Sequence, residues 1–170
     1  ADMLQVRLLG QFDVRLNGLA VDLPARPAQS LLAYLLLNAG TPHRREKLAG
    51  IFWPDSSDEN ARKNLRQELW RIRKAISAQD TNADDYFVAD EFTLTFNPDA
   101  NYWLDVNQIE KNDADIQSLI SNLSLYQGEL LPGFYEDWIL LERERIQTTF
   151  ESRMEELIGQ LVTAERWMAV

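Results

Sequence analysis

Apolar residues recur at helical spacing along residues 58–77, which is the longest regularly patterned stretch of the chain. The apolar positions follow at steps of four, four, three and four residues: Ala61, Leu65, Leu69, Ile72 and Ile76. Such positions share one quarter of a helix surface, so the pattern predicts one long amphipathic helix with a core-facing stripe. Asp58, or Ser57 just before it, is suited to cap this helix.

The opposite face of this predicted helix is polar and rich in cations. From Arg62 to Lys74 there are six basic residues and one acid, Glu68. Arginine and lysine can bind phosphates and guanine edges, and asparagine and glutamine can pair with adenine. The pattern is therefore consistent with a helix that reads the major groove of DNA. A solvated helix face is the other interpretation of the same residues.

Short strands and two further helices are predicted before the long helix. Residues 3–9, 11–16 and 19–23 read as strands of an antiparallel meander, with a turn signal at Asn17-Gly18. Residues 27–38 are apolar on nearly all sides, which predicts a helix buried on more than one face. Residues 41–53 read as a turn and a helix, which Pro54 ends. This helix and the long helix at 58–77, joined by a short break, form a helix-turn-helix in the broad sense.

A hairpin and an all-helical part are predicted after the long helix. Residues 86–88 and 92–96 read as the two strands of a hairpin wing, and residues 102–104 as a further short strand. From there the pattern is helical, and four helices are expected: 105–111, 113–125, 134–149 and 150–168. The apolar pattern runs to the end without a polar capping helix, so we expect a helical-repeat array that continues past residue 170.

Composition and charge restrict the function classes. The chain of 170 residues has no cysteine, which excludes disulfides and thiolate metal sites. No signal peptide and no membrane-length apolar run is evident, so a cytoplasmic protein is expected. The net charge is −10, yet residues 44–74 contain nine basic and five acidic residues. The positive charge is therefore concentrated around the long helix in an otherwise acidic chain.

Five segments of the chain carry a family resemblance: LLAYLLLNAG, REKLAGIFWPD, ENARKNLRQELWRIRKAI, LDVNQIE and YQGELLPGFYEDWILLERERI. The most specific points are Trp53-Pro54-Asp55, Asn60-Ala61-Arg62, and Gly128-Glu129-Leu130-Leu131 with Trp138. Together these segments resemble the SARP-type bacterial transcriptional activators. That family joins a winged helix of the OmpR/PhoB type to a bacterial transcriptional activator domain of tetratricopeptide-like helix pairs.

The resemblance implies an α+β fold in two domains. Residues 1–104 would form the winged helix-turn-helix with its N-terminal antiparallel sheet, and residues 105–170 the start of the all-α activator domain. It also implies a sequence-specific transcriptional activator that binds double-stranded promoter DNA and contacts RNA polymerase. A homodimer on direct repeats would fit the family. Membrane association is not expected, and the acidic balance of this chain departs from what DNA binding suggests.

Candidate DNA-binding residues follow from their places in the predicted elements. Base-edge contact is expected from Lys63, Asn64, Gln67 and Arg71, and phosphate contact from Arg62, Arg66, Arg73 and Lys74. DNA-backbone contacts beside the groove are expected from Arg44, Arg45 and Lys47, with a solvated helix start as the other interpretation. Thr93 and Thr95 in the hairpin are candidates for a phosphate or minor-groove contact, but the pattern favours ordinary strand packing for them. The other interpretation is that several of these residues pair with Glu59, Glu68 or the acidic second domain.

Two further aromatic side chains, Trp70 and His43, bear on the function. Trp70 projects with the cations, where it either packs on the wing or the second domain or contacts DNA. His43 is the single histidine. With no second histidine or cysteine nearby, it is expected to be neither a metal ligand nor a catalytic base.

No catalytic residues, cofactor or enzyme activity are expected. The alternative function is a protein-interaction module whose winged helix does not bind DNA.

Overall fold

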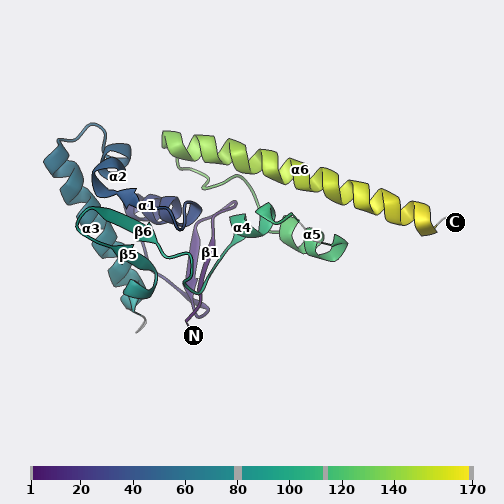
Figure 1. Ribbon diagram of the computed structural model, residues 1–170, viewed down its shortest axis with the longest axis horizontal. Coiled ribbons are helices and arrows are strands. Elements are labelled where there is room, and N and C mark those ends of the chain that lie inside the picture. The colour runs from purple at the N-terminus through teal and green to yellow at the C-terminus, as the bar shows by residue number, and fades with distance from the viewer. Residues whose placement is uncertain (1, 79–81, 113–114, 169–170) are drawn as a thin grey trace. The chain divides into compact units, whose positions relative to one another are not determined.

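A computed structural model describes residues 2–78, 82–112 and 115–168, and it has a mixed α+β architecture (Figure 1). Its contacts divide the chain into two compact units. The first comprises Val14–Tyr102 with the residues up to Gln5, and the second comprises Val6–Asp13 with the residues from Trp103 onward. The first unit carries the cationic helix.

The predicted N-terminal meander is present as short strands. They are β1 (Leu4–Arg7), β2 (Asp13–Leu16), β3 (Leu19–Ala20) and, later in the chain, β7 (Tyr102–Leu104). The sheet order is β3-β2-β1-β7, and Leu16 pairs with Leu19 across the turn between β2 and β3. Asn17 and Gly18 both have positive φ angles, as a tight hairpin turn requires. The third strand ends at Ala20, earlier than the predicted Leu23.

Three helices form the core of the first unit. They are α1 (Arg26–Leu37), α2 (Arg45–Phe52) and α3 (Asp58–Ser77), and α3 packs against both of the others. Helix α1 has Pro27 in its first turn, where the missing N–H is not needed. Seven of its residues, among them Leu31, Leu32 and Leu36, are buried. The expectation that α1 is covered on several sides is therefore confirmed.

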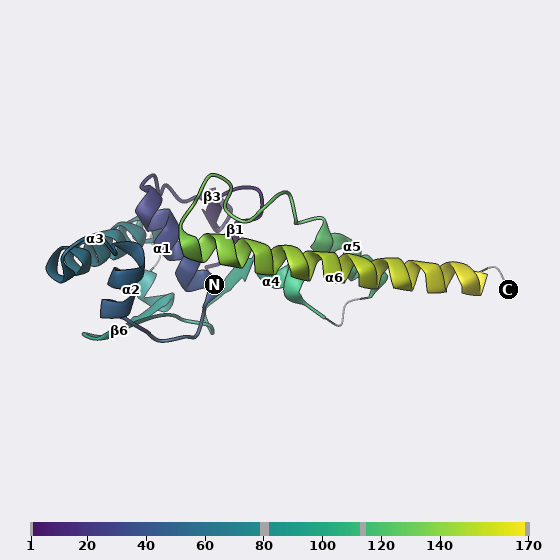
Figure 2. The same ribbon diagram turned by 90° about the horizontal axis from the view of Figure 1, so that it is seen from above.

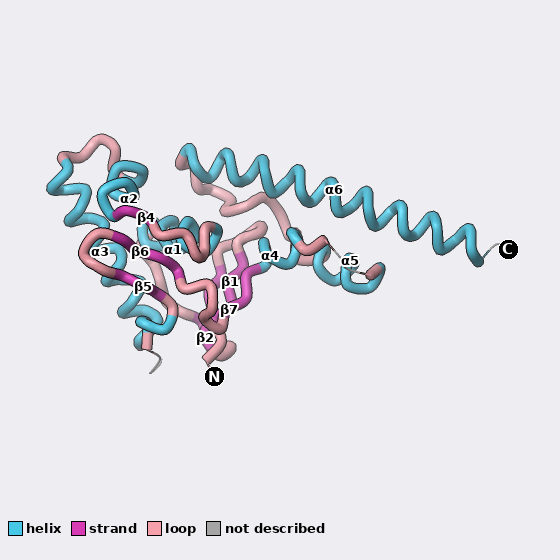
Figure 3. Tube along the Cα trace, viewed as in Figure 1, coloured by secondary structure: helices cyan, strands magenta, loops and turns pink. Residues whose placement is uncertain are grey.

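A second, smaller sheet lies beside these helices in the first unit. Its strands are β4 (His43–Arg44), β5 (Phe87–Ala89) and β6 (Thr93–Phe96), in the order β4-β6-β5 (Figure 3). The β5–β6 hairpin follows a short 3₁₀ helix, η1 (Ala83–Asp85). The sequence predicted the hairpin but not β4, because two residues of strand carry no periodic pattern.

The second unit contains helices α4 (Asp105–Glu110), α5 (Ile116–Leu123) and α6 (Asp137–Met168). Helices α4 and α5 pack against each other and both contact α6. The predicted break between residues 149 and 150 is wrong, since α6 is a single helix of 32 residues (Figure 2). Nothing at Thr149-Phe150 interrupts the backbone hydrogen bonds of a helix. Residues 113–114, where the helix 113–125 was expected to begin, lie outside the described residues.

A polar anchor at Asp105 joins two segments of the second unit that are distant in sequence. The Asp105 carboxylate accepts hydrogen bonds from the backbone N–H groups of Leu8 at 2.9 Å and Leu9 at 3.0 Å. Residue 105 is buried, and burial raises the pKa of its carboxyl group, while these N–H donors act in the opposite direction. This role could not be predicted from the sequence, because the partners are 97 and 96 residues away.

The Gly128-Glu129-Leu130-Leu131 segment pairs with the chain start within the second unit. Gly10 N–H donates to the Glu129 carbonyl at 2.8 Å, and Leu131 N–H donates to the Leu8 carbonyl at 2.9 Å. A Cβ on Gly10 would lie 2.8 Å from the backbone of Gln127, and Gly10 has a φ of +78°. A glycine is therefore required at this close approach.

Arg143 holds the loop that follows this pairing. Its guanidinium donates to the carbonyls of Leu130 at 2.9 Å, Leu131 at 2.8 Å and Phe134 at 3.0 Å. The Arg143 side chain is 13% exposed. One largely buried cation thus satisfies three carbonyl groups of a segment that lies outside the named helices and strands.

No described helix of either unit has the length and apolar character needed to cross a membrane.

Candidate nucleic-acid interface

Helix α3 begins with a regular N-terminal cap. The Ser57 hydroxyl accepts a hydrogen bond from the backbone N–H of Asn60 at 3.2 Å, so Ser57 rather than Asp58 is the capping residue. Asp58 and Glu59 occupy the first turn, where negative charge is favoured by the helix dipole. The predicted bounds of 58–77 agree with the observed helix.

One face of α3 is fixed in the core of the first unit. All five residues of the predicted stripe are buried: Ala61, Leu65, Leu69, Ile72 and Ile76. This burial sets the rotation of the helix and therefore decides which side chains point outward. Glu68 is also buried, at 5% exposure, which the sequence pattern did not predict.

The outer face exposes a continuous group of polar side chains. Arg62, Lys63, Arg66 and Gln67 are all exposed. Within the described part of the chain, the three cations of this group form no ion pair and no hydrogen bond. We call these four residues the outer cluster. Asn64, also predicted to contact a base edge, is half-buried at the margin of this face.

Three other predicted DNA contacts have partners within the first unit. Arg71 is paired with the buried Glu68 at 2.8 Å, and Arg73 with Asp84 at 3.6 Å. The ammonium group of Lys74 lies 4.7 Å from the ring centroid of Trp70. The pairing interpretation thus holds for Arg71 with Glu68. These three residues extend the cationic face toward the end of α3, but they are less available than the outer cluster.

The start of α2 contributes a second small group of cations. Arg44 and Lys47 are exposed, whereas Arg45 is half-buried and its Nε donates to the Asp90 carbonyl at 3.0 Å. Arg45 therefore fixes the hairpin to α2, and one of its N–H donors is not available for a phosphate. His43 packs its ring against Tyr34, and burial, assisted by the nearby Lys47, lowers its pKa. The lowered pKa disfavours the charged form of His43, so His43 adds little to the positive field at neutral pH.

The tip of the β5–β6 hairpin is organised by Asp90. Its carboxylate accepts hydrogen bonds from the N–H groups of Thr93 at 2.7 Å and Phe92 at 2.8 Å. These bonds lower the pKa of Asp90. The Thr93 hydroxyl also donates to Asp90, at 3.1 Å, so this predicted DNA-contacting residue is engaged in the turn itself. Phe92 remains 64% exposed beside Glu91.

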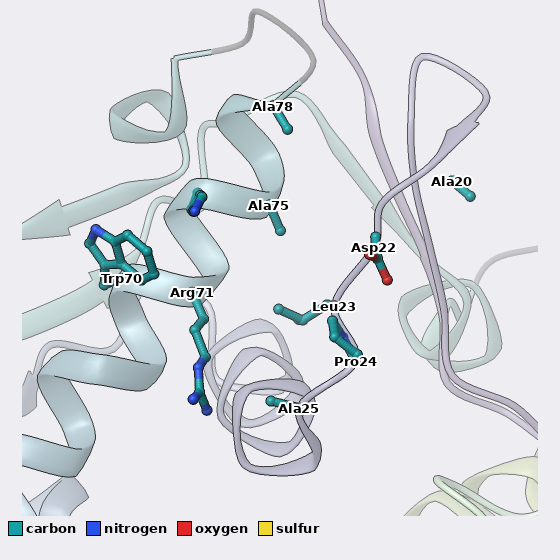
Figure 4. A pocket seen from close by; sticks show the side chains of 10 residues that line it. Ala20, Asp22, Leu23, Pro24, Ala25, Trp70, Arg71, Ala75 and Ala78 are labelled. Atoms are coloured by element: carbon teal, nitrogen blue, oxygen red, sulfur yellow. The ribbon is translucent and has the colours of Figure 1, made fainter.

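Trp70 lies at the surface of the first unit. Its side chain is 59% exposed, and it projects among the cations of α3 as the sequence indicated. This exposure does not fit the interpretation in which Trp70 packs on the wing of the first unit. Trp70 instead lies at the edge of a cavity between the second half of α3 and the segment that precedes α1 (Figure 4).

Comparison with known proteins supports the fold alone. No protein-family model matches the sequence, and no curated protein sequence matches it. Among solved structures, the chain is similar to EmbR of Mycobacterium tuberculosis, in a complex with a low affinity phosphopeptide. The two share 17% sequence identity with a TM-score of 0.67. The similarity covers 94% of this chain and 44% of that chain, so the present chain spans less than half of the EmbR chain.

Proposed function

We propose that the protein is a DNA-binding transcriptional regulator that places the outer face of α3 in the major groove. The observation that carries this proposal is the outer cluster: three cations with no ion pair among the described residues, and one glutamine, on a helix whose opposite face is fixed in the core. A helix presented in this way has the diameter and donor groups to enter the major groove. The likeness to EmbR adds support at the level of fold.

In this proposal the outer cluster divides between two tasks. Arg62 and Arg66 bind phosphates, while Lys63 and Gln67 reach base edges, because phosphate contacts set the register and base contacts carry specificity. Arg44 and Lys47 hold the backbone beside the groove. Arg71, Arg73 and Lys74 give weaker contacts, since each already has a partner in the first unit. Arg45 and Thr93 then serve mainly to position the hairpin.

Helices α1 to α3 and the β5–β6 hairpin act as a winged helix-turn-helix in the proposed protein. The hairpin tip carries Asp90 and Glu91 and no cation, so it contributes little to phosphate binding. The second unit is proposed as the start of a tetratricopeptide-like domain that contacts RNA polymerase. Binding as a homodimer on direct repeats of promoter DNA, in the cytoplasm and without an enzymatic reaction, completes the proposal.

A protein-interaction module without DNA binding is the second candidate. The observation that favours it is the net charge of −10, which opposes approach to a polyanion. This charge is spread over the chain, however, whereas nine of the cations fall within residues 44–74. Local potential governs docking within a Debye length of about 8 Å at physiological salt, so the cationic face decides the balance.

Selection from random duplexes tests the proposal directly. The full chain is incubated with a pool of random double-stranded DNA, and bound molecules are recovered, amplified and sequenced through repeated rounds. The proposal expects one enriched motif, and a tandem arrangement of it if dimers bind direct repeats. Recovery of DNA without any enriched motif would leave only non-specific binding. No recovery at low salt would favour the interaction module.

A further inference from the structure

The cavity beside α3 has the size and lining of a small-molecule site. Its volume is about 650 Å³, within the range of roughly 300–1,000 Å³ that is common for ligand pockets. One wall is formed by Leu23, Pro24 and Ala25, which precede α1, and the other by Ala75 and Ala78 of α3. Figure 4 shows Ala75 and Arg71 across the cavity from Leu23 and Pro24.

The charged side chains that line this cavity are few. Arg71 and Lys74 contribute two cations from α3, and Asp22 contributes one carboxylate from the opposite wall. The Arg71 side chain is 40% exposed, and its pairing with Glu68 leaves other N–H donors of the guanidinium available. Trp70 adds an aromatic surface at the edge. An apolar cavity with two adjacent cations is complementary to an apolar molecule that carries one negative group.

We infer that this cavity binds a small amphipathic organic anion, with an apolar body between the two walls and a carboxylate or sulfonate at Arg71 and Lys74. The ligand reduces DNA binding for two reasons. Its negative group neutralises cations on the same face of α3 as the outer cluster, and its apolar body occupies space beside that face. This second half rests on the proposed function. A ligand that removes one phosphate contact lowers DNA affinity about eightfold at 0.1 M salt.

The first experiment measures binding without DNA. The full chain, labelled with ¹⁵N, is titrated with 8-anilinonaphthalene-1-sulfonate, and the amide resonances of Leu23, Ala75 and Ala78 are followed. N-phenyl-1-naphthylamine, which has the same rings without the sulfonate, and inorganic sulfate are the matched controls. The sulfonate is expected to shift these three resonances and to bind about fivefold more tightly than its neutral analogue. Sulfate alone is expected to leave them unchanged.

Two variants assign the binding to the cavity. Ala75→Phe fills the space between the walls and should abolish the shifts. Lys74→Gln, at an exposed position that does not endanger folding, should weaken binding about two- to fivefold. Shifts confined to α6, or equal affinity for the neutral analogue, would overturn the inferred site. The same holds if Lys74→Gln has no effect.

The second experiment separates the ligand site from the DNA function. Affinity for the selected duplex is measured with and without saturating sulfonate, for the wild-type chain and for Ala75→Phe. The ligand should weaken DNA binding about eightfold in the wild type only. Sulfonate binding at the cavity with unchanged DNA affinity would overturn the regulatory half. Sulfonate binding in a chain that binds no DNA would instead refute the proposed function and leave the ligand site standing.

Discussion

Removing two charges from the outer cluster tests the reasoning about α3 most quantitatively. The double substitution Arg62→Gln with Arg66→Gln removes two exposed cations that have no ion pair in the described residues. The side chains point away from the buried stripe, and glutamine is a good helix former. We therefore expect the free energy of unfolding to change by less than about 0.5 kcal/mol.

The effect on DNA binding follows from counterion release. Each phosphate contact contributes about 0.9 to the slope of log affinity against log salt, so two contacts contribute about 1.8. At 0.1 M salt this corresponds to an affinity loss of about 60-fold, or about 2.4 kcal/mol. If one of the two arginines contacts a base edge rather than a phosphate, the slope change falls to about 0.9, and part of the loss becomes dependent on sequence.

A matched control isolates position from total charge. The pair Lys111→Gln with Arg166→Gln removes the same charge from exposed sites in the second unit. Affinity for the selected duplex is measured by fluorescence anisotropy at several salt concentrations for both double variants. We expect a loss of less than about threefold for the control. Equal losses for the two pairs would refute the argument, because only the total charge would then matter.

Three further predictions concern the internal contacts. Arg71→Ala leaves the buried Glu68 carboxylate without its partner and should cost about 1–2 kcal/mol in urea unfolding, whereas Glu68→Gln in the same chain should recover most of that loss. Ser57→Ala removes the cap of α3 and should cost about 1 kcal/mol, measured in the same way. Burial raises the pKa of Asp105 above 3.8. The unfolded chain therefore loses this proton first, and the contribution of Asp105 to the free energy of unfolding falls as pH rises from 3.8 to the raised pKa. Asp105→Asn should remove this contribution, measured as the pH dependence of the thermal unfolding midpoint.

The long helix was predictable because its signal is local. The stripe from Ala61 to Ile76 has a clear helical period, and its burial fixed the outward direction of Lys63 and Arg66. The turn at Asn17-Gly18 and the β5–β6 hairpin were likewise predicted from short-range patterns. The order of helices and strands therefore follows largely from the sequence. Arg62, Lys63 and Arg66, which were predicted on the outward side of the long helix, are exposed.

Contacts between distant segments were not predictable. The burial of Glu68 depends on its pairing with Arg71 and on the packing around α3, which helical period alone does not report. Asp105 and Arg143 satisfy backbone groups of other segments, and a charged residue in the sequence does not reveal such partners. The continuity of α6 was missed because the helix-pair expectation imposed a break that no residue at that point enforces.

Site-specific cross-linking shows directly whether the outer face of α3 meets the bases. The chain has no cysteine, so Asn60→Cys introduces a single attachment site on the exposed side of the α3 start for a photoreactive azidophenacyl group. Glu165→Cys, exposed on α6, serves as the control. We predict cross-links from position 60 to a few adjacent nucleotides of the selected duplex, and none from position 165. Absence of cross-links from position 60 in a chain that still binds the duplex would contradict the account.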